Sequence, residues 1–573
     1  VREDLVELIM AQIREPLAEL DLRGQIVANT TGRERILELC EREGADVVGR
    51  VMRAGVAHVA ASLRERLRAI PDGVWREVQY LDHDGHGHEV RKIVVTVTKQ
   101  GDHLGFDFTG SDPQTEGFAN CARGGLRAAV LSGVCIALGY DMAWNDGISE
   151  CVTITAPART IVTAEYPYPV SMSTISAIIV TLNLTLVALS RMLLTSPSHH
   201  EQAMASWCGT SLGVSMSGVN RDGILTVAPE ASHFAAGCGA RTYADGVDTG
   251  GIIINTTANI PSIEETEDAY PLLYLFRRQL TDSGGPGRFR GGVSGEVAIT
   301  PHGAPNGLVT SFAGVGSITP NAVGVAGGLP GATVRYLRFD GTGDDTIPMA
   351  GDLASIPGRR RAQEINSSKI PFGSGTVEYH NWQGGGGAGD PLDREPARVL
   401  QDVVNGLVSP EAARNVYGVA LAGDGVDALE TERVRGEIID ARLRNGRPYR
   451  EEHPLETSHS MGQPPVEEAM PWRLWDLCEI DAERDEVRCT RCSQVFGSVA
   501  ADIRLGCLVK EVAPDAAGAV RGEDYRELAS KPPVLRCFYC PGCGRQVECD
   551  LVLPGEVGPS SGLGVLTAQR GER

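Results

Sequence analysis

Apolar residues near the start of the chain recur at helical spacing. The first stripe consists of Leu5, Leu8, Ile9, Ile13 and Leu17. Two further apolar segments follow, around residues 36–39 and 63–67. Because residues three or four apart share one face of an α-helix, this pattern predicts a helical segment over residues 1–70.

Beyond residue 70 the pattern changes to short β-rich runs. Residues 93–98 and 106–108 are two such runs, and the turn-like residues 99–102 between them predict a hairpin. Residues 205–350 alternate short β-like runs with glycine turns. This alternation is typical of a packed β region.

An uncharged stretch from Tyr166 to Ser190 is long enough to span a bilayer. Polar residues interrupt the stretch, while its isoleucines and leucines recur at helical spacing. We therefore expect a buried core helix and no membrane span. The N-terminus lacks the basic start and apolar core of a signal peptide, so we expect a soluble, cytoplasmic protein.

Cysteines gather towards the end of the chain. Cys489 and Cys492 form one C-x-x-C knuckle, and Cys540 and Cys543 form another. Four thiolates in this arrangement hold one zinc ion tetrahedrally in a closed structural site. The sequence therefore predicts structural Zn²⁺ at these four residues, and redox-active or unrelated thiols are the alternative. Cys537 and Cys549 are reserve ligands.

These patterns predict an α+β fold with three parts. A helical N-terminal segment precedes a β-rich central body with a buried helix, and a small zinc-ribbon-like domain ends the chain. The predicted boundaries are 1–70 for the helical segment, 71–445 for the body, 446–470 for a linker rich in Pro, Glu and His, and 471–573 for the zinc-binding module.

The charge balance is acidic. There are 53 Lys and Arg residues against 74 Asp and Glu residues, which gives a net charge of −21. No basic patch with interleaved aromatic residues stands out, so we do not expect a nucleic acid as a partner. We expect a small-molecule substrate instead.

The stretch Phe106–Gly125 runs from a predicted strand through a loop into a predicted helix. Its polar side chains leave a sheet edge and meet a helix start, where free backbone N–H groups bind anions. Carboxylates repel anions, so we expect an arginine such as Arg123 or Arg127, or a bound cation, beside at least one of them. A capped strand–loop–helix without chemistry is the alternative. The candidate catalytic residues are Asp107, Asp112, Asn120 and Arg127.

Two further motifs are interpreted as structural. His83, His86 and His88 surround the turn signal Asp84-Gly85, so we expect a solvated turn although clustered histidines also bind metals. The glycines of residues 284–292 form an anion nest or a turn, and we favour the turn.

The segment DFTGSDPQTEGFAN at residues 107–120 resembles the hydantoinase B/oxoprolinase family, which includes the large subunits of acetone and acetophenone carboxylases. Other blocks fit the family in the same order over residues 1–421. They are Pro71–Gly73, Asn145–Gly147, Asp282–Arg288, Gly384–Pro391 and Leu407–Leu421. Family members usually carry a further N-terminal domain, so the resemblance implies either a fragment or a subunit whose N-terminal half is a separate polypeptide.

The C-terminal part carries a second resemblance. RCFYCPGCGRQVECD at residues 536–550, after VRCTRCSQVFG at 487–497, is similar to the zinc-bearing gamma subunit of acetone carboxylase. The fusion of both pieces favours the ketone carboxylase branch of the family. One departure concerns residues 171–176, where relatives often carry a Gly-Asn-x-Glu-Thr run that is absent here.

The resemblance implies a subunit of an ATP-dependent ketone carboxylase that uses bicarbonate. A subunit of a hydantoinase or 5-oxoprolinase, or a non-catalytic assembly scaffold, is the alternative. The resemblance also implies a hydantoinase A-like partner that handles ATP, and a further divalent metal in the complex. The sequence contains no Gly-Lys dipeptide and hence no Walker A loop, which agrees with ATP binding on the partner.

Overall fold

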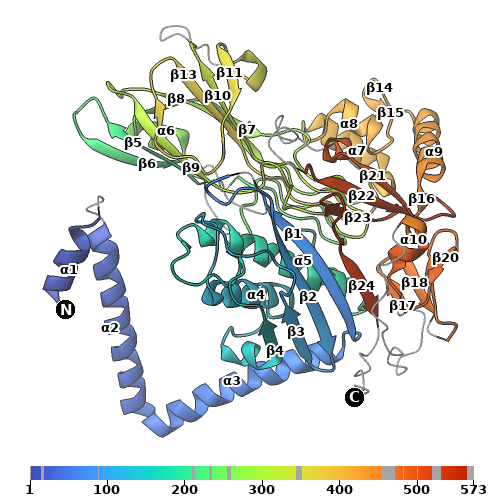
Figure 1. The fold of residues 1–573 in the computed structure, drawn as a ribbon, viewed down its shortest axis with the longest axis horizontal. Coiled ribbons are helices and arrows are strands. Elements are labelled where there is room, and N and C mark those ends of the chain that lie inside the picture. The colour runs from blue at the N-terminus through green and yellow to red at the C-terminus, as the bar shows by residue number, and fades with distance from the viewer. Residues whose placement is uncertain are drawn as a thin grey trace. The chain divides into compact units, whose positions relative to one another are not determined.

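The computed structural model describes most of the chain (Figure 1). The described residues are 2–13, 18–87, 89–208, 213–230, 235–254, 260–342, 351–452, 472–481, 483–499, 501–518 and 531–563. The chain divides into two compact units. One consists of residues 1–62 and 142–150, and the other of residues 63–141 and 151–573.

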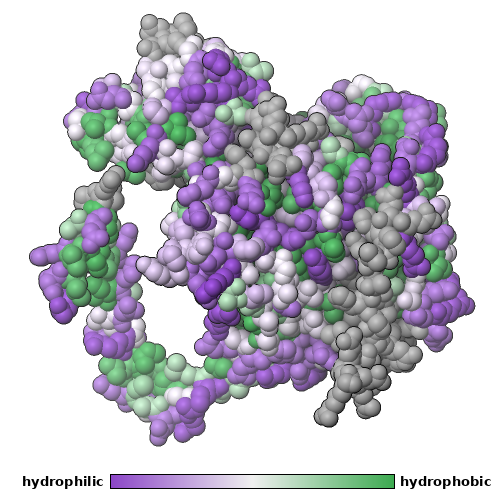
Figure 2. All heavy atoms as spheres, viewed as in Figure 1, coloured by the Kyte–Doolittle hydropathy of each residue, from purple (hydrophilic) through white to green (hydrophobic). Residues whose placement is uncertain are grey.

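The first unit confirms the predicted helical segment. Its helices are α1 (Glu3–Met10), α2 (Ala18–Glu43) and the larger part of α3 (Ala45–Arg68). Gly44 separates α2 from α3 with a φ of 90°, a left-handed conformation that glycine adopts without strain. Apolar side chains are exposed along these helices, as the green patches in Figure 2 show, and they include Leu5, Leu8, Leu20, Val27, Leu37 and Val51.

The first sheet of the second unit has the strand order β24-β1-β2-β3-β4. Its strands are β1 (Gly73–Leu81), β2 (Arg91–Gln100), β3 (His103–Asp107), β4 (Val152–Thr155) and β24 (Ser560–Leu563). The β2–β3 hairpin confirms the predicted one. β4 joins β3 in parallel, and β24 from the C-terminal part pairs with β1 in antiparallel register.

Helix α5 (Ala177–Leu194) packs against β1, β2 and helix α4 (Arg123–Leu138). It is the one helix of the described residues that is long and apolar enough to cross a membrane, but 94% of the window that meets this test is buried inside the protein. The predicted core helix is thereby confirmed.

A pair of sheets packs face to face in the central body, which confirms the predicted β-rich region. One sheet has the order β11-β10-β13-β8-β7 and the other β12-β9-β5-β6. Their shared core contains Val214, Phe312, Tyr336 and Trp382. The strands are β5 (Gly213–Val219), β6 (Leu225–Glu230), β7 (Leu272–Gln279), β8 (Gly295–Pro301), β9 (Leu308–Ala313), β10 (Arg335–Asp340), β11 (Arg359–Ala362), β12 (Ile370–Phe372) and β13 (Thr376–Asn381), with helix α6 (Ile263–Ala269) before β7.

Glycine-rich loops pack backbone against backbone beside this region. Gly385 donates to the carbonyl of Gly292 at 3.0 Å and accepts from Gly285 at 2.8 Å. A Cβ on Gly385 would lie 1.8 Å from the carbonyl oxygen of Cys238, so a side chain does not fit there. Arg290 in the same region is paired with Asp248 at 2.8 Å, which favours the predicted turn over an anion nest.

The body continues into short helices. They are α7 (Pro396–Val404), α8 (Pro410–Asn415), α9 (Ala428–Asn445) and α10 (Tyr449–Glu452), with the strand pair β14 (Leu421–Ala422) and β15 (Gly425–Val426). Ser409 caps α8 by accepting a hydrogen bond from the backbone N–H of Ala412. Most of the predicted linker, residues 453–470, lies outside the described residues.

The C-terminal part contains two small sheets. One has the order β17-β18-β19-β20 and the other β16-β21-β22-β23. Their strands are β16 (Arg447–Pro448), β17 (Trp472–Leu474), β18 (Cys478–Asp481), β19 (Glu486–Cys489), β20 (Val495–Gly497), β21 (Leu508–Val512), β22 (Val534–Tyr539) and β23 (Gln546–Val552). Short 3₁₀ helices lie at Asp146–Cys151, Ser173–Ile175, His200–Gln202, Leu353–Ser355, Pro391–Asp393, Ile503–Gly506 and Pro514–Ala517.

Candidate metal centre and neighbouring pocket

The four predicted cysteines come together in one cluster. The sulfur atoms of Cys489, Cys492, Cys540 and Cys543 all lie within 4.8 Å of one another. The Sγ atoms of Cys489 and Cys543 are 3.8 Å apart, and those of Cys492 and Cys540 are 3.6 Å apart. These four thiols form a site that can hold one metal ion.

The two knuckles share one backbone geometry. The N–H of Cys489 donates to Gln494 at 2.9 Å, and the N–H of Cys540 donates to Arg545 at 2.8 Å. Each first cysteine also accepts from the residue four positions on, at 2.9 Å in both knuckles. This matched pair of turns explains why two sequence motifs 51 positions apart present their sulfurs to one point.

Body residues anchor the knuckles. Asp393 pairs with Arg491 of the first knuckle and, at 3.0 Å, with Arg545 after the second. The carboxylate is mostly buried and is positioned by the short helix Pro391–Asp393. Cys537 and Cys549 lie outside the four-sulfur cluster, so the reserve ligands are not needed to complete it.

The predicted catalytic loop is held mainly by its own hydrogen bonds. Asp107 ends β3, is exposed, and accepts from Thr109 at 2.9 Å. The half-buried Asp112 accepts from the backbone N–H of Lys92 at 2.7 Å. The backbone of Asp107 lies opposite Thr96 on β2. Lys92, to which the Asp112 carboxylate is bonded, lies four residues or about 13 Å away along the same strand. The structure therefore does not bring them together.

Asn120 is fully buried, and its amide is saturated. Its oxygen accepts from the N–H of Thr115 at 2.8 Å, and its nitrogen donates to the carbonyls of Thr115, Gly117 and Pro169. This side chain closes the loop onto the segment before α5. Arg127 lies on the exposed face of α4. The catalytic role of the loop stays a prediction.

A turn forms around Asp84 as predicted, but the prediction that it is solvated is wrong at its start, because His83 is 3% and Asp84 7% exposed. The Asp84 carboxylate accepts from the N–H groups of His86 and Gly87, and the ring of His83 accepts from the N–H of Gly85. His88 lies outside the described residues.

A cluster of buried charges lies at the C-terminal end of α5, and no local sequence signal predicted it. Arg191 pairs with Glu77 of β1 at 2.8 Å, and with Asp550 and Glu548 of β23 at 3.0 and 3.5 Å. Arg504 pairs with Asp550 from the other side at 2.8 Å. Burial raises the pKa of Glu77 to about 7, although the charge of Arg191 opposes this.

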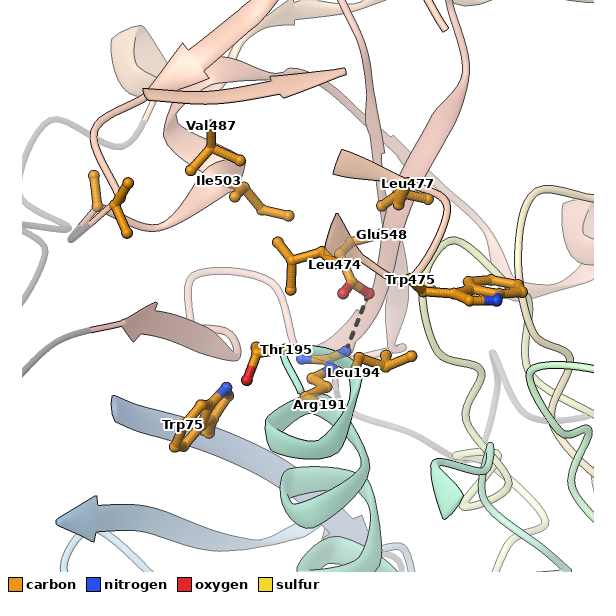
Figure 3. Close-up of a pocket in the computed structure, with 13 residues that line it drawn as sticks. Trp75, Arg191, Leu194, Thr195, Leu474, Trp475, Leu477, Val487, Ile503 and Glu548 are labelled. Carbon is orange, nitrogen blue, oxygen red and sulfur yellow. Dashed lines mark ion pairs between the residues drawn. The ribbon is translucent and has the colours of Figure 1, made fainter. Parts of the chain in front are cut away.

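An apolar pocket of about 50 Å³ opens beside this cluster (Figure 3). Trp75 and Thr195 lie on one side, Val487 and Ile503 lie across from them, and the paired Glu548 and Arg191 face each other between the two groups. Its walls come from β1, α5 and the cysteine-bearing part, so its shape depends on how these elements pack.

Comparisons with known proteins agree with this architecture. The hydantoinase B/oxoprolinase family model matches residues 1–391. The chain therefore belongs to the hydantoinase B/oxoprolinase family, and the four-cysteine cluster lies outside the matched region.

Similar proteins include enzyme subunits. The chain is 28% identical to the acetophenone carboxylase delta subunit of Aromatoleum aromaticum over 78% of this chain and 68% of that protein. It is 29% identical to the caprolactamase subunit beta of Pseudomonas jessenii over 74% and 70%. A nucleotide-free structure of an ATP-dependent acetone carboxylase shares the fold, with a TM-score of 0.68 and 23% identity over 76% of this chain and 61% of that one.

Proposed function

We propose that the chain is a subunit of an ATP-dependent ketone carboxylase that joins a ketone to bicarbonate. The observation that carries this proposal is the four-cysteine module held against a hydantoinase B family body by Asp393 and Arg191. The module resembles the gamma subunit of acetone carboxylase, and the body is similar to a subunit of acetophenone carboxylase. We place this enzyme in the cytoplasm.

We propose that the four-cysteine cluster holds zinc. In a tetrahedral site with Zn–S bonds of about 2.3 Å, neighbouring sulfurs lie about 3.8 Å apart. The Sγ–Sγ distances of 3.6 and 3.8 Å fit this geometry. Bound zinc would hold the two knuckles together, and all four positions would be filled by protein ligands, so its role is structural.

ATP is handled by a hydantoinase A-like partner in this proposal. The relatives named above are subunits, and this sequence has no Walker A loop. A separate N-terminal half of the hydantoinase B type is a possible second partner. A further divalent metal belongs to the complex and not to a motif of this chain.

The loop with Asp107, Asp112, Asn120 and Arg127 is our candidate for the substrate side of this subunit. The exposed Asp107 lies at the end of β3 and the half-buried Asp112 lies in the loop that follows, and the partner surface supplies the cation that these carboxylates need beside an anion. Asn120 is a positioning residue, because its amide holds the loop without a free donor.

A cyclic-amide hydrolase is the second candidate function. The 29% identity to a caprolactamase subunit over 74% of this chain favours it specifically. The missing Gly-Asn-x-Glu-Thr run at residues 171–176 is compatible with either substrate class.

The test is to co-purify the chain with its hydantoinase A-like partner and to supply ATP, labelled bicarbonate and a panel of ketones. We expect label in a non-volatile acid only when a ketone and ATP are both present, and no ATP turnover by this chain alone. Ring opening of lactams or hydantoins without bicarbonate would establish the hydrolase instead. If the complex neither fixes label into an acid nor opens a lactam or hydantoin ring, both proposals are refuted.

The loop is tested in the same assay. We expect Asp112→Asn to lower the turnover number at least tenfold, with Glu116→Gln, an exposed residue of the same loop, as the matched control. Equal activity of the two variants would show that the loop is only structural.

A further inference from the structure

Two cysteines outside the metal cluster face each other across neighbouring strands. Cys537 on β22 lies directly opposite Cys549 on β23 in antiparallel register. Their Sγ atoms are 3.7 Å apart, and each residue is only 3% exposed. All fourteen cysteines are free thiols in this structure, so the pair is reduced.

The backbone already has the geometry of a disulfide. Directly opposed residues of an antiparallel pair have Cα atoms about 4.5–5.5 Å apart, and disulfides span about 4.4–6.8 Å. The sulfurs therefore need only close from 3.7 Å to about 2.0 Å, which rotation of the two side chains accomplishes. No strand has to move.

One of the two cysteines lines a cavity. This cavity of about 250 Å³ lies between α9 and the sheet of β21 and β22, and Cys537 lines it whereas Cys549 does not. Lys510 lies opposite Cys537 on β21, and both Lys510 and Arg442 line the same cavity. A small reagent in this cavity therefore reaches Cys537 before Cys549. The charge that it meets there is the Lys510 ammonium, because Arg442 is paired with Asp390 at 2.7 Å.

We propose that Cys537 and Cys549 are a thiol–disulfide exchange site for small anionic disulfides. The Cys537 thiolate attacks one sulfur of the small disulfide and displaces the other sulfur as a thiol. Cys549 then gives up its proton and attacks the Cys537 sulfur, which releases the second small thiol. One small disulfide is reduced to two thiols, and the protein dithiol is oxidised to one cross-strand disulfide.

The division of roles between the two sulfurs also follows from their contact. The contact with the Cys549 thiol lowers the pKa of Cys537. The same contact and burial raise the pKa of Cys549. Cys537 is therefore the attacking sulfur and Cys549 the resolving one, in agreement with their positions relative to the cavity.

The experiment treats the metal-loaded full chain with dithiodiglycolate, a dianionic disulfide, and in parallel with cystamine, a dicationic one. Intact-mass and peptide analysis should show a Cys537–Cys549 bond, no retained adduct and no loss of metal. Each rate is divided by the rate of the same reagent with a free small thiol. After this correction dithiodiglycolate should react about fivefold faster than cystamine, which is the effect expected of one exposed ion pair. Lys510→Gln should bring this ratio towards one.

Three variants separate the steps. Cys537→Ser should abolish the reaction, and Cys549→Ser should stop it at a stable mixed disulfide on Cys537. Cys40→Ser, at a partly exposed thiol in α2, is the matched control and should change nothing at residues 537 and 549. Free thiols at both positions in the treated, metal-loaded protein, or a Cys549→Ser protein without an adduct on Cys537, would overturn the proposal.

Discussion

Single side chains would decide whether the four-cysteine cluster can hold a metal ion. In the proposed zinc site each clustered cysteine would supply one of four ligands, and a site with three thiolates binds zinc much more weakly than a complete one. Cys507 is also buried in this part but lies outside the cluster, and its Sγ contacts the carbonyl of Ile503 at 3.3 Å. It therefore provides a matched comparison.

We predict one zinc ion per chain in the purified protein and none in the Cys540→Ser variant. The variant should also unfold at a lower temperature, because metal binding to a folded site is folding free energy. Elemental analysis and thermal unfolding measure both effects, and Cys507→Ser should keep its zinc. The prediction is contradicted if the wild-type protein is purified without metal and the Cys540→Ser variant unfolds at the same temperature as the wild type.

Two titratable neighbours on β13 act in opposite directions with pH. Burial raises the pKa of Glu378 to about 7, even though Tyr336 and Thr310 donate to its carboxylate at 2.8 and 3.0 Å. Burial lowers the pKa of His380 to about 3. The folded protein thus keeps Glu378 protonated above its usual range and His380 neutral below its usual range.

We predict that Glu378 makes the protein less stable as pH rises from about 4.5 to about 7. Over this interval the unfolded chain releases the proton while the folded chain retains it, and a shift of this size corresponds to about 3 kcal/mol. Glu378→Gln should therefore gain stability relative to the wild type between pH 5 and pH 7.5 in urea unfolding. Glu411→Gln, at an exposed carboxylate, should track the wild type, and a constant difference between Glu378→Gln and the wild type would contradict the assignment.

At the scale of elements, close packing of α4 on α5 depends on glycine. A Cβ on Gly133 of α4 would lie 2.7 Å from Cγ2 of Thr185. Thr185 is held in place because its hydroxyl donates to the carbonyl of Thr181 at 2.8 Å. Gly124, in the same helix, has open space around it.

We predict opposite effects of alanine at these two glycines. Gly124→Ala should stabilise the protein by about 0.5–1 kcal/mol, because alanine favours the helix and nothing obstructs its Cβ. Gly133→Ala should destabilise it by about 1 kcal/mol, because the clash with Thr185 exceeds the same gain in helix propensity. Urea unfolding of the two variants measures the difference. Equal stabilisation by both would show that Thr185 of α5 shifts to accommodate the added Cβ without a loss of stability.

Elements with a regular spacing of apolar residues or a clear turn signal were predictable from the sequence. The distant residues that they contact were not. The apolar spacing of α5 and the turn between β2 and β3 are local signals, so both were found. The pairing of Asn120 with Pro169, and of Asp82 with the N–H of Ile318 at 2.6 Å, joins residues far apart in sequence. From the sequence, Asn120 was predicted to be a catalytic residue because of its side-chain type. The sequence gives no sign that the distant carbonyl of Pro169 accepts from its amide.

At the scale of the whole molecule, long-range pairs tie the C-terminal part into the second unit. The cysteine spacing predicted the metal cluster because each knuckle lies within four residues. The sequence did not predict the antiparallel pairing of β24 with β1, or the contact of Arg191 with Asp550 across 359 positions. Both the cysteine-bearing sheets and the body therefore lie in one compact unit of the chain.

We predict that Arg191→Met destabilises the body and the metal centre together, by about 3–5 kcal/mol. The substitution leaves Glu77, Glu548 and Asp550 buried without their shared cation, and uncompensated buried charge is costly. Because the cluster joins β1, α5 and β23, tryptophan fluorescence and zinc release should shift to lower urea together. Arg414→Met removes an exposed pair with Glu430 and should cost at most about 0.5 kcal/mol. If zinc release in Arg191→Met stays at the wild-type urea concentration while fluorescence shifts, the metal module unfolds independently and the buried cluster does not couple it to the body.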